Sequence, residues 1–146
     1  MANNTEKYFL GLAGEYAVCS ELAKRKIQAN LTLGNKKSID IIIVDENNIA
    51  TTIEVKTTNK KRFVTGFFQK YKSPETPHPD FWVFVMIDNI LSTRFFILKH
   101  EELAKIQMAR NNMTNWVENK NGVDNVLVEH VVDFENSWEK LIKNLK

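Results

Sequence analysis

Hydrophobic and polar residues change from a helical period to an alternating one within the first 60 positions. At the start of the chain, apolar residues recur three and four positions apart, Asn3 or Thr5 can cap a helix, and the cations at 24–26 suit its C-terminal turn. β-branched runs follow, and a polar turn over 45–48 separates two of them. The elements expected here are a helix and three strands, over 5–28, 29–33, 38–44 and 49–58.

The second half of the chain is less regular, but one run in it is distinctive. FWVFVMI, at 81–87, is a continuous apolar run typical of a central strand that is buried on both faces. The stretch 60–72 before it is basic and aromatic and can end in a short helix, and all three prolines lie in the loop 74–79. The remaining elements expected are a strand, a helix, a strand and a helix, over 94–98, 101–110, 126–132 and 135–146.

These elements predict one domain over 1–146, of mixed α/β or α+β class, with a sheet at its centre and helices beside it. Hydrophobic residues make up 43% of the chain and charged residues 26%, which is typical of a soluble globular protein. The sequence has no apolar run of membrane-spanning length and no secretory signal pattern at its start. With Cys19 as the single cysteine, we expect a cytoplasmic protein.

Three ionisable residues lie inside the strand patterns of the hairpin, where apolar residues are expected. Because successive strand residues point to opposite faces, Glu54 and Lys56 share one face of their strand. Pairing across the turn can bring Asp40 next to Glu54 or Lys56. A second interpretation is an edge strand with a solvated face, on which Glu54 and Lys56 form a weak surface pair.

The first helix adds a third carboxylate, Glu15, which falls inside the apolar arc of that helix. An ionised carboxylate among apolar groups is costly unless it is paired or binds a metal. Glu15 therefore either pairs with a cation such as Lys56 or lies at the edge of a site, and a cation site shared with Asp40 and Glu54 explains all three carboxylates. The other residues of the arc are Tyr8, Phe9, Leu12, Tyr16, Val18, Cys19, Leu22, Ala23 and Ile27.

The ligand chemistry of this set favours a hard divalent cation. Carboxylate oxygens suit Mg²⁺ or Mn²⁺, whereas the histidines, His78, His100 and His130, are too scattered for a zinc site. The sequence has neither a Gly-rich phosphate loop nor a Gly-x-Ser-x-Gly motif. A divalent cation beside a lysine indicates phosphodiester hydrolysis, because the metal activates water and polarises the phosphoryl oxygen while the lysine orients the water or offsets negative charge.

The order of these residues, Glu15 on a helix, Asp40 on a strand and Glu54-Val55-Lys56 on the next, resembles the PD-(D/E)XK nuclease superfamily, which includes restriction endonucleases and Holliday-junction resolvases. The resemblance covers roughly 5–98, the αβββαβ core of that superfamily, and 99–146 would be a C-terminal extension. Separations of 25 residues from Glu15 to Asp40 and 14 from Asp40 to Glu54 are most similar to compact resolvase-like and restriction-like members. Ile39 stands where the superfamily's name has a proline.

The resemblance implies a nuclease that depends on Mg²⁺ or Mn²⁺, and more specifically a DNA endonuclease with a restriction endonuclease-like core. Asp40 and Glu54 would be metal ligands, the Val55 backbone carbonyl would complete the shell, and Glu15 would join the same site or a second one. Lys56 would position or activate the attacking water. A structure-selective resolvase that works as a homodimer is a related expectation.

Contacts to nucleic acid are expected from the basic segment that follows the catalytic strand. Residues 1–73 hold 12 Lys and Arg against 7 Asp and Glu, whereas 74–146 hold 8 against 11, an asymmetry compatible with a polyanionic partner. Aromatic residues of 63–71 could stack on bases, but we expect most of them to pack into the core. The cations expected to neutralise phosphates are Lys60, Lys61, Arg62, Lys70 and Lys72, with Lys36 and Lys37 adding to the rim.

Two non-enzymatic interpretations stay open beside the nuclease. One is a catalytically inert nucleic-acid-binding or protein-binding module on the same fold, which would bind DNA equally well in EDTA and never nick it. The other is a soluble domain in which a Glu15–Lys56 pair is merely structural. A purely structural role does not require three carboxylates to meet, and this favours the nuclease.

Overall fold

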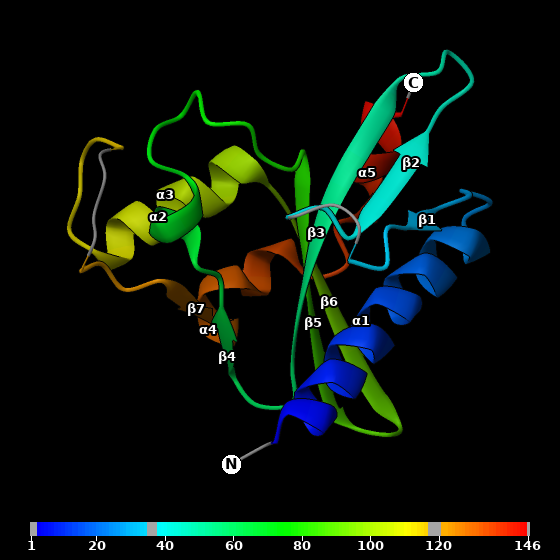
Figure 1. The fold of residues 1–146 in the computed structure, drawn as a ribbon, viewed down its shortest axis with the longest axis horizontal. Helices are drawn as coiled ribbons and strands as arrows, with labels where there is room; N and C mark the ends of the chain where they lie inside the picture. The colour runs from blue at the N-terminus through cyan, green and yellow to red at the C-terminus, as the bar shows by residue number, and fades with distance from the viewer. Residues whose placement is uncertain (1–2, 35–37, 117–120, 146) are drawn as a thin grey trace.

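The computed structural model describes residues 3–34, 38–116 and 121–145, and its fold is built on a five-stranded sheet with helices beside it (Figure 1). The strand order is β1-β2-β3-β5-β6, and every neighbouring pair is antiparallel except β3 and β5. This confirms the expected mixed class with a central sheet. The strands are β1 (Asn30–Leu31), β2 (Ile41–Val44), β3 (Ala50–Thr58), β5 (Phe81–Asn89) and β6 (Ser92–Lys99).

A second, two-stranded sheet joins the basic segment to the C-terminal part of the chain. Its strands, β4 (Arg62–Val64) and β7 (Asn125–Leu127), pair antiparallel. None of the described helices is both long and apolar enough to cross a membrane. The helices are α1 (Asn4–Lys24), α2 (Phe67–Lys70), α3 (His100–Arg110), α4 (Val128–Val131) and α5 (Trp138–Asn144), with a 3₁₀ helix over Val132–Phe134.

Two hydrophobic cores lie on opposite faces of the central sheet, and β5 contributes to both. Phe81, Val83 and Val85 face the core that α1 and α5 complete, while Trp82 and Phe84 face the core that α2, α3, β4 and β7 complete. All five side chains are buried. The expected central strand at 81–87 is therefore confirmed, because only a strand covered on both faces needs apolar residues at consecutive positions.

Helix α1 begins where the sequence indicates and ends earlier. Asn3 is the N-cap: its side chain accepts a hydrogen bond from Glu6 N at 2.8 Å, and its own backbone N–H donates one to the Glu6 carboxylate at 3.1 Å. The helix stops at Lys24 rather than at residue 28. The reason is that Lys26 adopts a positive φ of 62°, and Lys26 N donates to the Ala23 carbonyl.

The apolar arc expected on α1 is buried over only part of its length. The helix rests on the sheet along Gly14, Val18 and Leu22, which are spaced four residues apart and are all buried. Tyr8, Phe9 and Tyr16 fall outside this line and are 59%, 62% and 55% exposed. Helical periodicity alone made the arc too broad, since it cannot show which part of a helix a sheet covers.

The strand expected over 126–132 is wrong beyond Leu127. Among the described residues, the pairing of β7 is with β4 and covers 125–127. The chain then turns into α4, where the His130 ring accepts a hydrogen bond from Leu127 N at 3.0 Å. The last helix likewise begins at Trp138 rather than 135, because the chain before it bonds to β6 through Asn136 N and the Phe95 carbonyl.

Gly14 sets how closely α1 approaches the sheet. A Cβ at this position would lie 2.9 Å from the Thr57 Cβ and collide with the Thr57 hydroxyl. Glycine therefore allows the α1 backbone to lie directly against β3. Because Glu15 follows Gly14, this contact also determines where the Glu15 carboxylate enters the structure.

Gly14→Ala should lower the free energy of unfolding by about 1–3 kcal/mol, because the added methyl group forces α1 away from β3. The matched control is Gly11→Ala: no described atom beyond its chain neighbours and its own helix backbone lies within 4 Å of a Cβ there, and alanine should stabilise the helix by up to about 1 kcal/mol. Urea unfolding measures both changes. Equal effects of the two substitutions would contradict the close contact at Gly14.

Candidate active site

Asp40 is fixed to β3 by the backbone rather than by another side chain. It lies just before β2, whose register pairs Ile41 with Ile53. The Asp40 carboxylate accepts a hydrogen bond from Val55 N at 2.7 Å, and Asp40 N donates to the Ile53 carbonyl at 2.9 Å. The expectation that the hairpin brings Asp40 next to Glu54 or Lys56 is confirmed, since Val55 lies between them.

Glu54 is a buried carboxylate with one partner. Only 3% of the residue is exposed, and its Oε1 accepts a hydrogen bond from Lys70 Nζ at 2.8 Å. Its Oε2 is buried and has no hydrogen-bond partner among the residues that the structure describes. Burial raises the pKa of Glu54 above its usual value, and the nearby Lys56 and Lys70 oppose this shift.

The same burial acts on Asp40 and Lys56 in opposite directions. It raises the pKa of Asp40, against the lowering effects of the Val55 N–H and of Lys56. It lowers the pKa of the half-buried Lys56, against the raising effect of Glu54. In each case the low dielectric disfavours the charged form. These groups are therefore perturbed together, as catalytic groups often are.

Glu15 approaches this cluster from α1. It is half-buried, and it lines a cavity of about 380 Å³ together with Asp40, Tyr8 and Leu33. Burial raises the pKa of Glu15, and the charge of Asp40 raises it further. Within the part of the chain that the structure describes, no ion pair joins Glu15 to Lys56. The structure therefore does not show the Glu15–Lys56 pair on which the purely structural interpretation depends.

The donor atoms suit a hard cation, although the side chains are not gathered around one point. Among residues 3–34, 38–116 and 121–145, no three His, Cys, Asp or Glu side chains form a group that could hold a metal ion. One oxygen of Glu54 accepts a hydrogen bond from Lys70 Nζ, and one oxygen of Asp40 accepts a hydrogen bond from Val55 N. The unpartnered Oε2 of Glu54 is a buried oxygen of the kind that Mg²⁺ prefers.

Lys70 belongs to this cluster rather than to the exposed cations. The sequence analysis expected it among the phosphate-binding residues, and that expectation stays a prediction; in the structure its ammonium contacts Glu54. No local pattern could have revealed this, because the two residues are 16 positions apart and meet only through the direction of α2. Lys70 Nζ also lies 5.9 Å from the centre of the Trp82 ring.

The other cations expected at phosphates lie on the surface. Lys60, Lys61 and Arg62 are exposed at the turn between β3 and β4 and at the start of β4, and Lys72 is exposed after α2. Lys36 and Lys37 lie outside the described residues. The aromatic residues of the segment are all buried, which confirms that they belong to the core: Phe63, Phe67, Phe68 and Tyr71.

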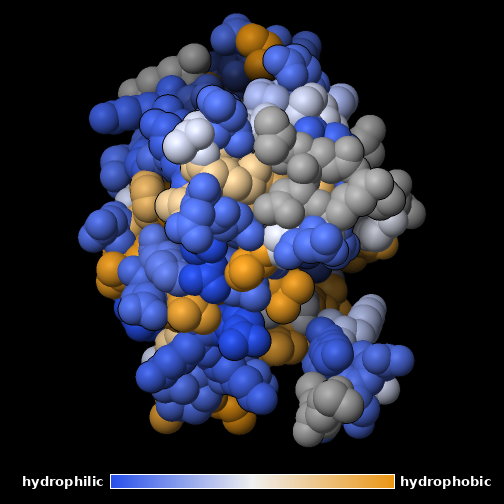
Figure 2. All heavy atoms as spheres, turned by 90° about the vertical axis from the view of Figure 1, so that its left-hand side faces the viewer, coloured by the Kyte–Doolittle hydropathy of each residue, from blue (hydrophilic) through white to orange (hydrophobic). Residues whose placement is uncertain are grey.

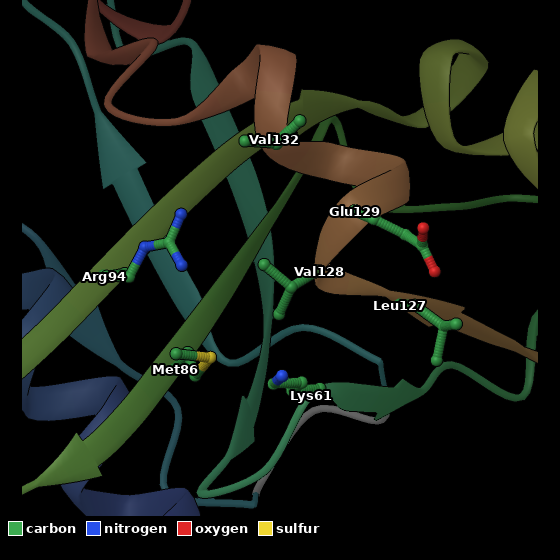
Figure 3. Close-up of a pocket in the computed structure, with 7 residues that line it drawn as sticks. All are labelled: Lys61, Met86, Arg94, Leu127, Val128, Glu129 and Val132. Carbon is green, nitrogen blue, oxygen red and sulfur yellow. The ribbon is translucent and has the colours of Figure 1, made fainter.

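The side of the molecule that carries α2, α3 and β4 is mainly hydrophilic, with hydrophobic side chains in separate clusters between (Figure 2). A second cavity, of about 550 Å³, lies between β5 and β6 and the α4 segment (Figure 3). Met86, Leu127, Val128 and Val132 supply its apolar lining, and Lys61 lies at its edge. None of the four candidate catalytic residues lines this cavity, so it is separate from the carboxylate cluster.

A solved structure of a bacterial homing endonuclease is similar to this chain over almost its whole length. The likeness has a TM-score of 0.57 and covers 94% of this chain and 93% of the other, with 11% sequence identity. At this identity the likeness shows a shared fold. No protein-family model matches the sequence, and no curated protein matches it.

Glu54→Gln should change how the stability of the metal-free protein depends on pH. Burial raises the folded-state pKa of Glu54, so its contribution to stability is full below the unfolded pKa and is lost as the pH rises through the folded pKa. In EDTA, the stability of the variant relative to the wild type should therefore rise as the pH increases. Urea unfolding across a pH series measures this difference.

Glu21→Gln is the control, because the pKa of Glu21 is shifted in the opposite direction from that of Glu54. Its hydrogen bond from Lys24 lowers the pKa of Glu21, so that carboxylate contributes stability above its unfolded pKa and loses it as the pH falls. A difference between wild type and Glu54→Gln that does not vary with pH would show that the Glu54 carboxyl is not perturbed by burial.

Proposed function

We propose that this protein is a Mg²⁺-dependent nuclease, and specifically a DNA endonuclease of the PD-(D/E)XK type. One observation carries the proposal: the Asp40 carboxylate is hydrogen-bonded to the backbone between the buried Glu54 and the half-buried Lys56. A fold shared with a bacterial homing endonuclease supports it. Apolar residues would serve stability better at these positions, so a chemical role explains why they are charged.

Asp40 and Glu54 would hold the Mg²⁺, and Mn²⁺ would suit the same oxygens. The Val55 carbonyl and Glu15 would provide further oxygen donors. Bound there, the cation would supply Lewis acidity, which activates water and stabilises the negative charge that develops on the phosphoryl group.

The roles of the side chains follow from how they are held. Asp40 is oriented by the Val55 N–H, so its carboxylate needs no rearrangement before substrate binds. Lys56 is half-buried on the same strand, and because burial lowers its pKa, it gives up a proton more readily than a surface lysine. Lys56 would thus orient the attacking water and assist its deprotonation.

The substrate contacts would come from exposed cations on the chain that leaves β3. Lys60, Lys61 and Arg62 would neutralise phosphates of the DNA backbone, and Lys72 would extend this surface. The whole chain would act as a single nuclease domain in the cytoplasm, with 99–146 as an extension of the core. Cutting both strands of a duplex would then take two copies of the chain, as in a homodimer.

Lys56→Ala should reduce Mg²⁺-dependent nicking of supercoiled plasmid by about 100-fold or more, because the group that orients the water is lost. Binding of the same DNA should change little, since phosphate contacts come from other residues. Gel assays of nicking and fluorescence anisotropy of binding separate the two effects. Lys105→Ala, an exposed lysine on α3, is the matched control and should cleave like the wild type.

Nicking by Lys56→Ala at the wild-type rate would refute the assigned role. A wild type that binds DNA equally well in EDTA and never nicks it would instead establish the inert binding module. Calorimetry with Mn²⁺ gives a third arm, because Asp40→Ala should abolish a heat of binding that the wild type shows.

Lys60→Ala and Lys61→Ala should each weaken DNA binding with little dependence on sequence. Each lost phosphate contact should reduce the slope of log K against log salt by about 0.9. Binding measured at several salt concentrations gives the slope. Lys143→Ala removes an exposed lysine on α5 and should leave the slope at its wild-type value. If Lys60→Ala and Lys61→Ala also keep the wild-type slope, the DNA binds elsewhere on the protein.

A further inference from the structure

Lys70 reaches Glu54 from the short helix α2, which buried side chains hold in place. Helix α2 has four residues, and its first two, Phe67 and Phe68, are buried in the core beneath it. Gly66 precedes it with a positive φ of 62°, which lets the chain turn sharply from β4 into the helix. Lys70 is the last residue of α2, and its ammonium lies 2.8 Å from Glu54 Oε1.

We propose that Lys70 is an internal counter-cation: it occupies the cation position of Glu54 in the metal-free protein and leaves when a divalent metal binds. This inference rests on the proposed function, because it assigns a competitor to the metal at the same carboxylate. Lys70 is thereby a positioning residue that sets metal affinity, not a residue that contacts the reacting atoms.

The formal charges of the cluster indicate that Lys70 and a divalent metal cannot both contact Glu54. The carboxylates of Asp40 and Glu54 cancel the ammonium groups of Lys56 and Lys70, so with Glu15 the cluster carries one net negative charge. A divalent metal added to this set, with Lys70 still in contact with Glu54, would put three cations together in a region of low dielectric. Their mutual repulsion is strong there, so one cation has to move away.

The exposures of the two partners show which group can move. The side chain of Glu54 is 3% exposed and that of Lys70 is 27% exposed. Rotation about its four side-chain bonds can carry the Lys70 ammonium into water without any change in the backbone of α2. Lys56 lies on β3 itself, with its side chain in the cluster, so it stays as the metal enters.

The arrangement has a consequence for both states of the site. Without metal, Lys70 gives the buried Glu54 carboxylate a directly hydrogen-bonded cation beside Lys56, and losing that contact would be destabilising. When metal is bound, the released Lys70 ammonium has lost its contact with Glu54 but stays close to the site. The negative charge of an incoming phosphodiester can then pair with it. The protein is thus stable before it binds its cofactor, and it binds that cofactor less tightly than the bare carboxylates would.

Lys70→Met tests the inference, because methionine keeps the length of the side chain and removes its charge. In EDTA, the unfolding temperature should fall by about 2–4 °C, since Glu54 loses its partner. In calorimetry with Mn²⁺ alone, affinity should rise about tenfold, since the metal no longer displaces a cation. Opposite changes in stability and in metal affinity are not expected from a lysine that is merely structural.

Two further variants complete the design. Lys105→Met, on the exposed face of α3, should change neither quantity. Should Lys70→Met not fold, Lys70→Gln can still donate a hydrogen bond to Glu54 but carries no charge, and its Mn²⁺ affinity must also rise.

The outcomes distinguish failure of the Lys70 inference from failure of the proposed metal-dependent nuclease. Mn²⁺ binding by the wild type that is unchanged or weaker in the uncharged variants overturns the inference alone. Mn²⁺ binding by neither protein overturns the proposed metal-dependent nuclease, and the counter-cation with it. Tighter binding in the variant together with lower metal-free stability is the expected result.

Discussion

A strand that is buried on both faces and still carries charged side chains is the constraint on which this structure depends. β3 lies between β2 and β5, and its register places Glu54 beside Trp82 and Lys56 beside Phe84. Water cannot solvate Glu54 there, so its partners must come from the protein. The neighbouring elements supply them: the hairpin brings Asp40 and α2 brings Lys70. The polar cluster is thus assembled around one strand by elements from three parts of the chain.

This cluster stabilises the fold less well than apolar side chains would. The raised pKa values of Asp40 and Glu54 and the lowered pKa of Lys56 have the same principal cause, which is burial. A buried ion pair contributes little net stability compared with apolar packing. Proteins retain such arrangements where function requires them, and departures from the apolar pattern of a strand are where function is best sought.

The parts of this structure that depend on local period could be predicted from the sequence. The shared face of Glu54 and Lys56 follows from strand alternation, the hairpin from two β-rich runs joined by a polar turn, and the central strand at 81–87 from its continuous apolar run. The pairing of β4 with β7 could not be predicted, because each strand has three residues and about 60 positions separate them. The contact of Lys70 with Glu54 depends on the direction of α2, and the exposure of Tyr8 on how far the sheet extends under α1. Both are tertiary properties with no local signal.

The contact between Gly14 and Thr57 also limits how this sequence can change over evolution. Because a Cβ at position 14 would occupy the space of the Thr57 side chain, the two positions cannot vary independently. A larger residue at 14 requires a smaller one at 57, or a helix set further from the sheet. The second course would carry Glu15 away from Asp40. Substitution of Gly14, which has no reactive side chain of its own, is therefore limited by the distance that must be kept between Glu15 and Asp40.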